Sequence, residues 1–484
     1  MKKTVVLYPA ILTSHFVPMM ELADVLLEEG YAVAVAVIDI TMEQNAELAA
    51  AVARAASSKP PVAFHTLPRI RDPPTFTHGV EVLLWYFELV RRYNESLHGF
   101  ISSMPAGSVH SLIVDVGSVD AFDVAKDLGI PVFTFYPTSA STVAIFLQLP
   151  SIRAPGQPSF KDLGDAHLNF HGVQPMPASH LTPEMLEDPQ SEIYKVMMSK
   201  FRKNLDADGI LVNTFGSLES RAVGALRDPR LLPGSKCTIP PVHCVGPLVV
   251  GSSGETKEKH ECMAWLDRQP ERSVVFLCFG SLGEAKHSEE QLKEIAVGLE
   301  SSGHRFLWVL RAPALSDKER LFDPHTNPDL DTLLPDGFLE RTNGRGLVVK
   351  LWAPQVDVLR HKATGVFVTH CGWNSVLEGV TAGVPMLCWP LYAEQKMNKV
   401  VMVEEAGIGV EVVGWQQGLV SSEELEAKVR LMMESQEGER LRARVTAHKE
   451  AAAMAWKDGG SSRAAFGKFL SDAAACQGTR NTRV

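Results

Sequence analysis

Short runs of β-branched and other apolar residues alternate along the chain with longer segments of helical periodicity. The runs "TVVLYP", "YAVAVAVID", "SLIVDV" and "IPVFTFYP" are each followed by a helical pattern, such as "PMMELADVLLEEG" after the first. The alternation restarts at "SVVFLCFGS" and continues through "RFLWVL", "GVFVTH" and "VPMLCWP". Apolar strands separated by helices are typical of parallel sheets covered on both faces. The pattern predicts an α/β protein with two doubly wound domains in tandem.

A stretch of different composition separates the two alternating regions. It reads "PGSKCTIPPVHCVGPLVVGSSGETKEKH" and is rich in Pro, Gly, Ser and charge, which is typical of a linker. We expect an N-terminal domain over 1–245, a linker over 246–258, a C-terminal domain over 259–455 and a tail over 456–484. A second irregular stretch, residues 311–338, is predicted to be a long surface loop.

Composition excludes several classes of partner. Lys and Arg number 47 against 57 Asp and Glu, a net charge of −10 that should repel nucleic acid and anionic lipid. No apolar run reaches the length of a membrane span, and Pro9, His15 and Pro18 interrupt the only signal-like segment. The seven cysteines are scattered without a CxxC pair, which fits a reducing compartment. We expect a cytoplasmic monomer that acts on small molecules.

The stretch "THCGWNSVLEGVTAGVP", residues 369–385, predicts a strand that feeds a helix from about Trp373 to Gly383. A helix N-terminus binds phosphate through its unpaired N–H groups. His370, Asn374 and Ser375 add side-chain donors, and one turn further on Glu378 can accept from vicinal ribose hydroxyls. The stretch therefore predicts a nucleotide site. Because neighbours on a strand point to opposite faces, His370 and Cys371 should not form a nucleophilic pair.

Further polar and aromatic groups fall at neighbouring strand ends. Trp352 offers a flat surface for a base and Gln355 follows it, while Glu394 and Gln395 follow the next strand. Ligands of open α/β sheets bind at the carboxyl ends of strands, where all these groups lie.

A second constellation lies in the first domain. His15 is expected in the loop between the first strand and a helix opening at Pro18, and Asp115 ends the "SLIVD" strand, so both belong at one sheet edge. An imidazole oriented by a carboxylate is a good general base near neutral pH. Taken alone, a solvated His and a capping Asp remain the alternative.

The segment from Trp352 to Gln395 resembles the signature box of plant family 1 UDP-sugar-dependent glycosyltransferases. "VGPL", "WLDRQPERSVVFLCFGS", "LPDGFLER" and the tail "AAMAWKDGGSSRAAFGKFL" extend the resemblance over essentially the whole chain. It implies a GT-B-like fold, with two facing doubly wound Rossmann-like domains, a cleft between them and a tail that crosses back to the first domain.

The resemblance also implies a role for each matching residue. His15 and Asp115 would be the catalytic pair. Gln395 is the last residue of the signature box, and a Gln at this position resembles that of family members that use UDP-glucose. The donor would be held at its base and ribose by Trp352, Ala353, Gln355 and Glu378, at its diphosphate by Ser281, His370, Asn374 and Ser375, and at its sugar by Thr138, Trp373, Glu394 and Gln395.

The expected activity is inverting, metal-independent transfer of glucose from UDP-glucose to a hydroxyl of a small plant phenolic such as a flavonoid, chalcone or other phenylpropanoid. No cofactor is expected, and we attribute the acidic triplets "DLD" at 329–331 and "DAD" at 206–208 to chance rather than to a metal site. Candidate acceptor-pocket residues, each of which also fits simple core packing, are Trp85, Phe87, Phe122, Phe146 and Met197.

Three alternatives stay open. The same base could direct transfer to a ring carbon of a phenol, giving a C-glycosyltransferase. A non-catalytic nucleotide-sugar binding protein is possible but would not need His15 and Asp115. An NAD-dependent oxidoreductase is disfavoured because no GxGxxG follows any strand.

Overall fold

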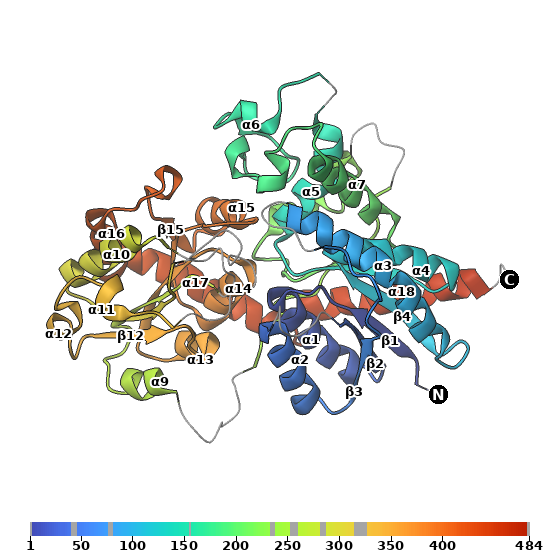
Figure 1. The fold of residues 1–484 in the computed structure, drawn as a ribbon, viewed down its shortest axis with the longest axis horizontal. Coiled ribbons are helices and arrows are strands. Elements are labelled where there is room, and N and C mark those ends of the chain that lie inside the picture. Colours follow the sequence, from blue (N-terminus) through green and yellow to red (C-terminus); the bar gives the residue numbers. More distant parts are fainter. Residues whose placement is uncertain are drawn as a thin grey trace. The chain divides into compact units, whose positions relative to one another are not determined.

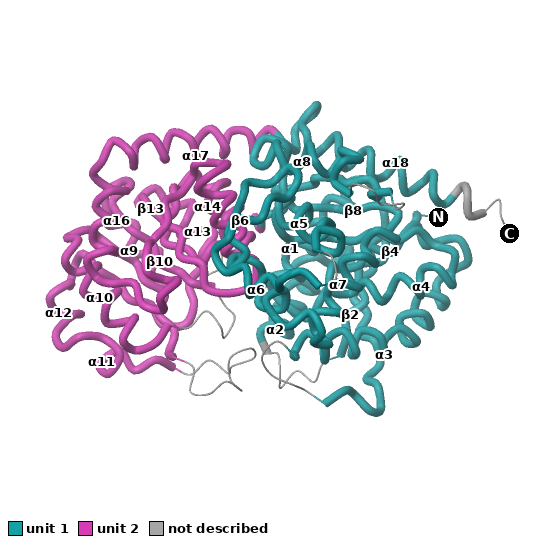
Figure 2. The backbone as a smooth tube through the Cα atoms, turned by 90° about the horizontal axis from the view of Figure 1, so that it is seen from above, with its two compact units in different colours: residues 1–249, 455–484 teal, residues 250–454 magenta. Residues whose placement is uncertain are grey.

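The computed structural model describes residues 2–39, 46–75, 81–153, 156–232, 238–251, 260–280, 287–313 and 327–481. The chain divides into two compact units, residues 1–249 with 455–484 and residues 250–454 (Figure 2). Of the expected linker, residues 252–258 lie outside the described residues.

The first unit is built on a seven-stranded parallel sheet of order β3-β2-β1-β4-β5-β8-β9. Every residue of the central strands β4 and β5 is buried, as expected when helices cover both faces. The strand order reverses between β1 and β4, so the carboxyl ends of these two strands border the natural binding crevice of the sheet. The strands are β1 (Thr4–Tyr8), β2 (Ala32–Ile38), β3 (Val62–Leu67), β4 (Val109–Asp115), β5 (Val132–Tyr136), β8 (Gly209–Val212) and β9 (Val242–Cys244), with β6 (His167–Leu168) and β7 (Met176–Pro177) forming a separate antiparallel pair.

Helices cover this sheet (Figure 1). The C-terminal helix α18 (Ser461–Asn481) packs against β9 and β4. The others are α1 (Thr13–Glu28), α2 (Ala46–Ser58), α3 (Val82–Ser102), α4 (Phe122–Asp127), α5 (Ala140–Ile152), α6 (Phe160–Leu163), α7 (Glu192–Lys203) and α8 (Ser220–Ala225), with short turns η2 (Val116–Ala121), η3 (Ala178–His180), η4 (Pro183–Met185), η5 (Asn204–Asp206) and η6 (Pro229–Leu231).

The second unit repeats the plan with a six-stranded parallel sheet of order β12-β11-β10-β13-β14-β15. Its order reverses between β10 and β13, which places another crevice outside the ends of these strands. The strands are β10 (Val274–Cys278), β11 (Arg305–Leu310), β12 (Gly346–Lys350), β13 (Thr364–Thr369), β14 (Met386–Cys388) and β15 (Gly409–Glu411).

Sequence signals mark the helix ends of this unit. In α10 (Glu289–Ser302), Ser288 caps the start by accepting from the Gln291 amide, and Gly303 ends the helix in a left-handed conformation. The other helices are α9 (Glu261–Leu266), α11 (Leu330–Leu333), α12 (Phe338–Arg341), α13 (Gln355–Arg360), α14 (Trp373–Ala382), α15 (Gln395–Val400), α16 (Ser422–Glu434) and α17 (Gln436–Ala455), with η9 (Val401–Glu405) and η10 (Trp415–Gln417).

Two expectations about local structure are wrong. Helix α1 begins at Thr13, so His15 lies in its first turn and not in a loop. The Leu12 carbonyl already accepts from the amides of His15 and Phe16, and Pro18, which has no N–H, removes only one backbone hydrogen bond from a helix that has begun. The described part of the expected loop 311–338 contains α11, which Asp329 caps by accepting from the Asp331 amide, so the carboxylate of this acidic triplet serves a helix start.

Candidate active site and donor-binding site

The structure brings His15 and Asp115 together at the switch point of the first sheet. His15 Nδ1 lies 2.8 Å from Asp115 Oδ2. Asp115 is fully buried at the end of β4, and its other oxygen accepts from the Gly117 amide at 2.8 Å. A carboxylate only accepts hydrogen bonds, so Nδ1 carries the ring proton and Nε2 keeps its lone pair. The His15 side chain is 28% exposed, so the imidazole is partly open to solvent.

The turn between β13 and α14 has the geometry of an anion cradle. The strand ends at Thr369, and α14 begins at Trp373. Its N-cap residue is Gly372, which has no side chain to cap the helix. Gly372 therefore does not cap the first amides of α14, where the positive end of the helix dipole lies. The helix ends at Gly383 with a φ of 78°, as the sequence pattern predicted.

Two glycines enclose the imidazole of His370. A Cβ atom at Gly280 would lie 2.8 Å from His370 Nε2, and one at Gly372 would lie 2.5 Å from it. Any side chain at either position would displace the ring. Burial lowers the pKa of His370 to about 4, so the imidazole is neutral near neutral pH and acts as a hydrogen-bonding group, not as a cation.

Cys371 packs away from His370, but the expected reason was wrong. The strand has already ended, and Cys371 takes a left-handed conformation with a φ of 65°. Its Sγ lies 3.6 Å from the Thr369 carbonyl and contacts Cys388. Burial raises the pKa of the Cys371 thiol well above its usual value, so it is no nucleophile.

A hydrogen-bonded network joins α13 to α14. Gln355 Nε2 donates to Ser375 Oγ at 2.9 Å and to Glu378 Oε2 at 2.6 Å. Glu378 is half-buried, and this burial raises the pKa of its carboxyl to about 7, against the opposing effects of Gln355 and the charge of Arg360. The carboxyl is thus held in one orientation, with its second oxygen left for a ligand.

Trp352 stands out among the large hydrophobic residues because 64% of it is exposed. Its ring meets His260 edge-on, with centroids 5.8 Å apart. The following Ala353 is buried. An exposed indole close to a polar network is a suitable surface for a planar base.

Gln395 is buried, and its side chain has a defined orientation. Its Oε1 accepts from the amides of Leu391 and Tyr392, both at 2.9 Å, so the NH₂ group is the part that remains to donate to a ligand. Asn398 Nδ2 donates to Glu394 Oε1 at 3.3 Å and to the Cys371 carbonyl at 3.1 Å. Asn398 therefore ties the turn that carries Gln395 to the turn that carries His370.

Comparison with known proteins decides the family. The family described as "UDP-glucoronosyl and UDP-glucosyl transferase" matches residues 238–444. Anthocyanidin 5,3-O-glucosyltransferase of a Rosa hybrid cultivar is 40% identical, covering 96% of this chain and 98% of that protein. This chain belongs to the UDP-glycosyltransferases.

Two further relatives support the assignment. Phloretin 2'-O-glucosyltransferase of Pyrus communis is 37% identical over 97% of this chain and 99% of its own length. UGT2 of Phytolacca americana, solved with UDP-2-fluoro-glucose and pterostilbene, superposes with a TM-score of 0.84 at 32% identity, covering 98% of this chain and 100% of that one. The UDP-glycosyltransferase therefore has the GT-B fold and uses a UDP-sugar donor.

Thr138, expected near the sugar, is buried just after β5 in the first unit of the UDP-glycosyltransferase. Glu219 fixes this turn by accepting from the amides of Ala140 at 2.8 Å and Ser141 at 3.0 Å, and its burial raises the pKa of the carboxyl. Sequence reasoning missed Glu219 because nothing in the chain links it to a turn almost 80 residues earlier. It also missed Gly280, which packs against His370, and Asn398, which hydrogen-bonds Glu394. Ser281 lies outside the described residues.

The predicted acceptor residues mostly make packing contacts. Trp85, Phe87 and Phe122 are buried. Phe87 lies under Lys200, with Nζ 4.9 Å from the ring centroid, and Phe146 stacks on Phe201 at 4.4 Å, so both contact α7. Met197 is half-buried on α7. These contacts favour the core alternative, and the role of these residues in an acceptor pocket stays a prediction.

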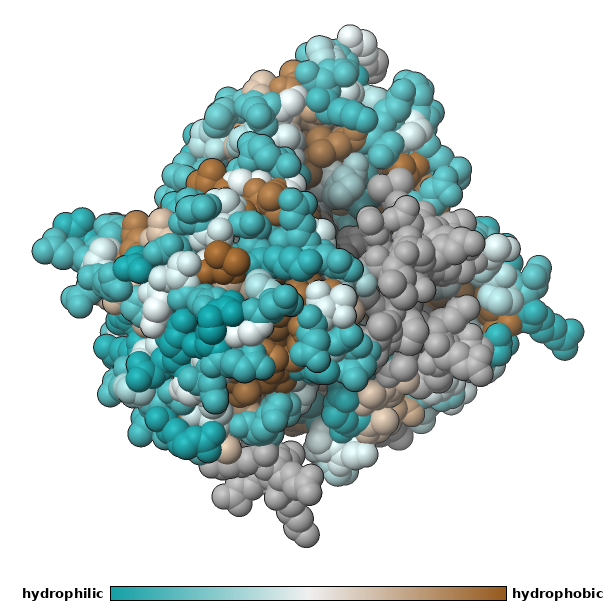
Figure 3. Space-filling view, turned by 60° about the vertical axis from the view of Figure 1, so that its left-hand side comes forward, coloured by the Kyte–Doolittle hydropathy of each residue, from teal (hydrophilic) through white to brown (hydrophobic). Residues whose placement is uncertain are grey.

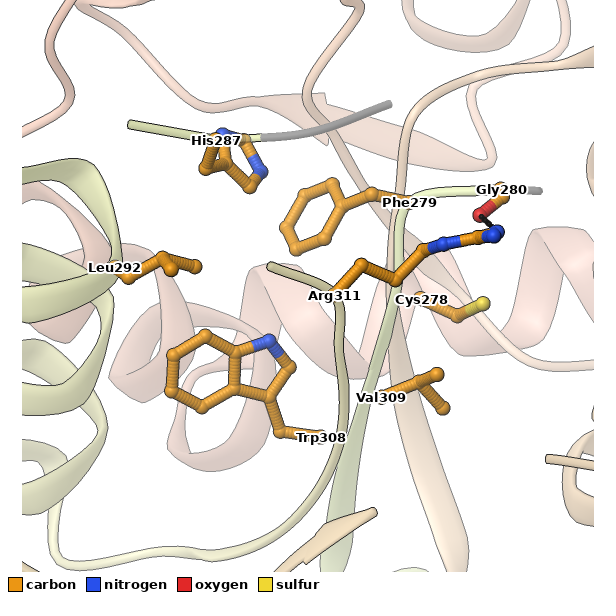
Figure 4. Close-up of a pocket in the computed structure, with 8 residues that line it drawn as sticks. All are labelled: Cys278, Phe279, Gly280, His287, Leu292, Trp308, Val309 and Arg311. Carbon is orange, nitrogen blue, oxygen red and sulfur yellow. Dashed lines mark hydrogen bonds between the residues drawn. The ribbon is translucent and has the colours of Figure 1, made fainter. Parts of the chain in front are cut away.

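A small cavity in the second unit borders Gly280, the glycine that packs against His370 (Figure 4). Phe279, Leu292 and Trp308 point toward its centre, while Arg311 donates to the Gly280 carbonyl at 3.2 Å. Its free space is about 10 Å³, room for roughly one water molecule, so it is no ligand site. Arg311 instead holds the turn against which His370 packs. The remaining lining residues are Cys278, His287 and Val309.

A larger cavity of about 360 Å³ adjoins the turn that carries Gln395. Leu391, which donates to Gln395, lines it together with Trp389, Lys396 and Trp415. Lys396 Nζ lies 5.6 Å from the centroid of the Trp415 ring.

Within the described ranges, no set of three or more His, Cys, Asp and Glu residues is grouped to hold a metal ion. In the same part of the chain, no helix has both the length and the apolar character needed to cross a membrane. The face seen in Figure 3 is largely hydrophilic, with hydrophobic residues scattered over it in small groups.

Proposed function

We propose that this UDP-glycosyltransferase transfers glucose from UDP-glucose to a hydroxyl of a small plant phenolic with inversion at the anomeric carbon. The observation that carries the proposal is the 2.8 Å hydrogen bond between His15 Nδ1 and Asp115 Oδ2. It gives the chain a partly exposed base with a fixed tautomer, which a protein that only binds nucleotide-sugars would not need.

The acceptor hydroxyl donates its proton to His15 Nε2 as its oxygen attacks the anomeric carbon. Asp115 stabilises the imidazolium formed in this step, and because both carboxylate oxygens are already engaged, the pair needs little rearrangement during the reaction. Attack opposite the departing phosphate inverts the configuration and gives a β-glycoside from an α-linked donor.

The UDP part of the donor is bound by residues of the second unit. Its uracil stacks on the exposed face of Trp352 with Ala353 and Gln355 beside it, and its ribose hydroxyls donate to Glu378. The amino end of α14, with His370, Asn374, Ser375 and Ser281, stabilises the charge that develops on the leaving diphosphate. This arrangement supplies the electrostatic stabilisation without a metal ion.

Glu394, Gln395, Trp373 and Thr138 bind the sugar. The buried NH₂ group of Gln395 can donate to one sugar hydroxyl, since its oxygen is engaged by two amides. Glucose as the sugar is supported by the names of the anthocyanidin and phloretin glucosyltransferases, and a phenolic acceptor is supported by the same names and by the pterostilbene bound to UGT2.

We propose that the enzyme acts in the cytoplasm as a monomer. The support for the location is chemical: the six described cysteines, which exclude Cys237, form no disulfide, and Cys244, Cys262, Cys371 and Cys388 are buried. Free thiols persist in a reducing compartment.

The test incubates the protein with UDP-glucose, UDP-galactose or UDP-glucuronate against a panel of flavonoids and chalcones. Product mass, UDP release and the anomeric proton coupling of the product are measured, with and without EDTA. We expect β-O-glucosides from UDP-glucose in both conditions. Loss of transfer in EDTA would refute the metal-free mechanism, and products stable to acid would indicate C-glycosylation.

His15→Ala tests the base. We expect transfer to fall at least about 100-fold while UDP binding is retained, because general-base catalysis contributes about 10²–10⁴-fold. His98→Ala on α3 is the matched control, since this His hydrogen-bonds only Ser102 of its own helix in the described contacts. Near-full O-transfer by His15→Ala would refute the assignment.

A further inference from the structure

Tyr86 on α3 reaches both segments that carry the catalytic pair. Its hydroxyl lies 2.8 Å from Ser118 Oγ, in the turn η2 that follows Asp115. The same hydroxyl lies beside the backbone of Ile11, which is in the segment between β1 and the first turn of α1. One phenol therefore hydrogen-bonds the turn that follows Asp115 and lies next to the segment that leads into His15.

The ring of Tyr86 also defines the turn beside Asp115. A Cβ atom at Gly117 would lie 2.9 Å from Tyr86 Cε1 and 3.3 Å from Asp115 Oδ1. Only a glycine fits between the tyrosine ring and the carboxylate, and the Gly117 amide is the group that holds Asp115 Oδ1. Tyr86, Gly117 and Asp115 are thus packed in series.

We propose that Tyr86 is a positioning residue for the His15–Asp115 pair, because its hydroxyl and its ring hold the turn whose Gly117 amide orients the Asp115 carboxylate. This inference rests on the proposed role of His15 as the base. Tyr86 is not a catalytic residue, since it acts through Ser118 and Gly117.

Charge does not complicate this role. Burial raises the pKa of Tyr86 far above its usual value, and burial does the same for Tyr136 at the end of β5, the second tyrosine whose charge would reach Asp115. Both phenols are neutral at any assay pH. Asp120, which also faces Tyr86, is paired with Lys200.

Other contacts hold α3 against η2 without the Tyr86 hydroxyl. Asn94 Nδ2 donates to the Asp120 carbonyl at 2.9 Å, and the Tyr86 ring keeps its packing when the hydroxyl is removed. Tyr86→Phe should therefore fold and bind UDP normally, while the turn that orients Asp115 loosens. We therefore expect the substitution to lower kcat and to leave the KM for the donor unchanged.

The experiment measures kcat, donor KM and UDP affinity for Tyr86→Phe. We expect kcat to fall roughly tenfold with the other two unchanged, since small displacements of reacting groups have effects of this order or larger. Tyr93→Phe is the matched control on the same helix: it loses a comparable hydrogen bond, from Tyr93 Oη to the Asp39 carbonyl at 2.9 Å, and should keep its kcat. Ser118→Ala removes the partner of the same bond and should lower kcat in the same direction.

A double-variant cycle separates positioning from general destabilisation. If Tyr86 acts through the base, adding Tyr86→Phe to His15→Ala should not slow the residual reaction further. An unchanged kcat in Tyr86→Phe, or an equal further loss in the double variant, would overturn the proposal for Tyr86 alone. Full activity in His15→Ala would instead refute the assignment of His15 as the base, and this inference would fail with it.

Discussion

Glu378→Gln should stabilise the ligand-free protein at alkaline pH and weaken UDP binding. Burial raises the pKa of Glu378 from 4.5 to about 7. Between these values the folded chain keeps the proton that the unfolded chain has lost, so folding stability falls as pH rises and the loss is complete above about pH 7. The difference corresponds to about 3 kcal/mol, an upper bound because water screens a half-buried carboxylate.

The substituted amide is neutral at every pH and can still accept from Gln355. Its stability advantage over the parent should therefore grow from about zero near pH 4.5 to at most about 3 kcal/mol at pH 8. In a unit the size of residues 250–454, this is a rise in Tm of up to roughly 10 °C. Thermal unfolding of both proteins at pH 5, 6, 7 and 8 measures the difference, with Glu290→Gln on the exposed side of α10 as the control.

UDP affinity should change in the opposite direction. A carboxylate that accepts ribose hydroxyls contributes about 1.5–3 kcal/mol per bond, so Glu378→Gln should bind UDP about 10–100-fold more weakly at pH 8. For the parent enzyme, UDP affinity should strengthen as pH rises through about 7, because ionised Glu378 is the better acceptor. Calorimetric titration at pH 6 and pH 8 measures both effects. If the stability difference between variant and parent did not change with pH, the pKa of Glu378 would not be raised in the folded protein. If the variant bound UDP as tightly as the parent, the carboxylate would not contact UDP.

Three further outcomes are expected. Gly372→Ala should weaken UDP binding at least tenfold in calorimetry, because its Cβ would lie 2.5 Å from His370 Nε2, whereas Gly99→Ala, with nothing within 4 Å, should bind normally; equal affinities would contradict the packing argument. Gln395→Glu keeps the oxygen that two amides require but loses the NH₂ donor, so the KM for UDP-glucose should rise roughly tenfold while UDP affinity is unchanged, and a parallel loss of both would indicate a disrupted turn. Cys371→Ala should retain at least about half of the parent rate in steady-state assays, since the thiol is buried and protonated, and a large loss with UDP binding intact would reopen a chemical role.

The sequence pattern predicted best the parts of the site with local signals. Helix α14 follows a continuous apolar strand, begins after a glycine and ends at a left-handed glycine, and each of these features can be recognised within a few residues. The proximity of His15 and Asp115 was also predictable, because consecutive βα units place strand ends at a common edge. The start of α1 was misplaced since Pro18 suggested a beginning, whereas a helix that already has its first hydrogen bonds accepts one missing N–H.

Contacts between distant segments could not be predicted in this way. Glu219, Asn398 and Tyr86 lie on helices or turns with no motif of their own, and each acts by hydrogen-bonding a backbone or side chain that only the fold brings near. Cys371 shows the same limit on a smaller scale. Its side chain points away from His370 because Cys371 has a left-handed backbone conformation after the end of the strand. The rule that successive side chains on a strand point to opposite faces does not apply there.

The deepest difference between the predicted and the observed site concerns atoms, not residues. A sequence can nominate Gln395 and Glu378 as ligands for hydroxyls, but an amide has both a donor and an acceptor end and a carboxyl can carry a proton. For Gln395, the fold decides which end faces a ligand: Oε1 accepts from two amides, so the NH₂ group is the end that remains to donate. For Glu378, both protonation states are populated near neutral pH, because burial brings the pKa of its carboxyl to about 7. On the proposed role of Glu378, donor binding ionises this carboxyl, so we expect UDP affinity and folding stability to respond to pH with opposite signs through one residue.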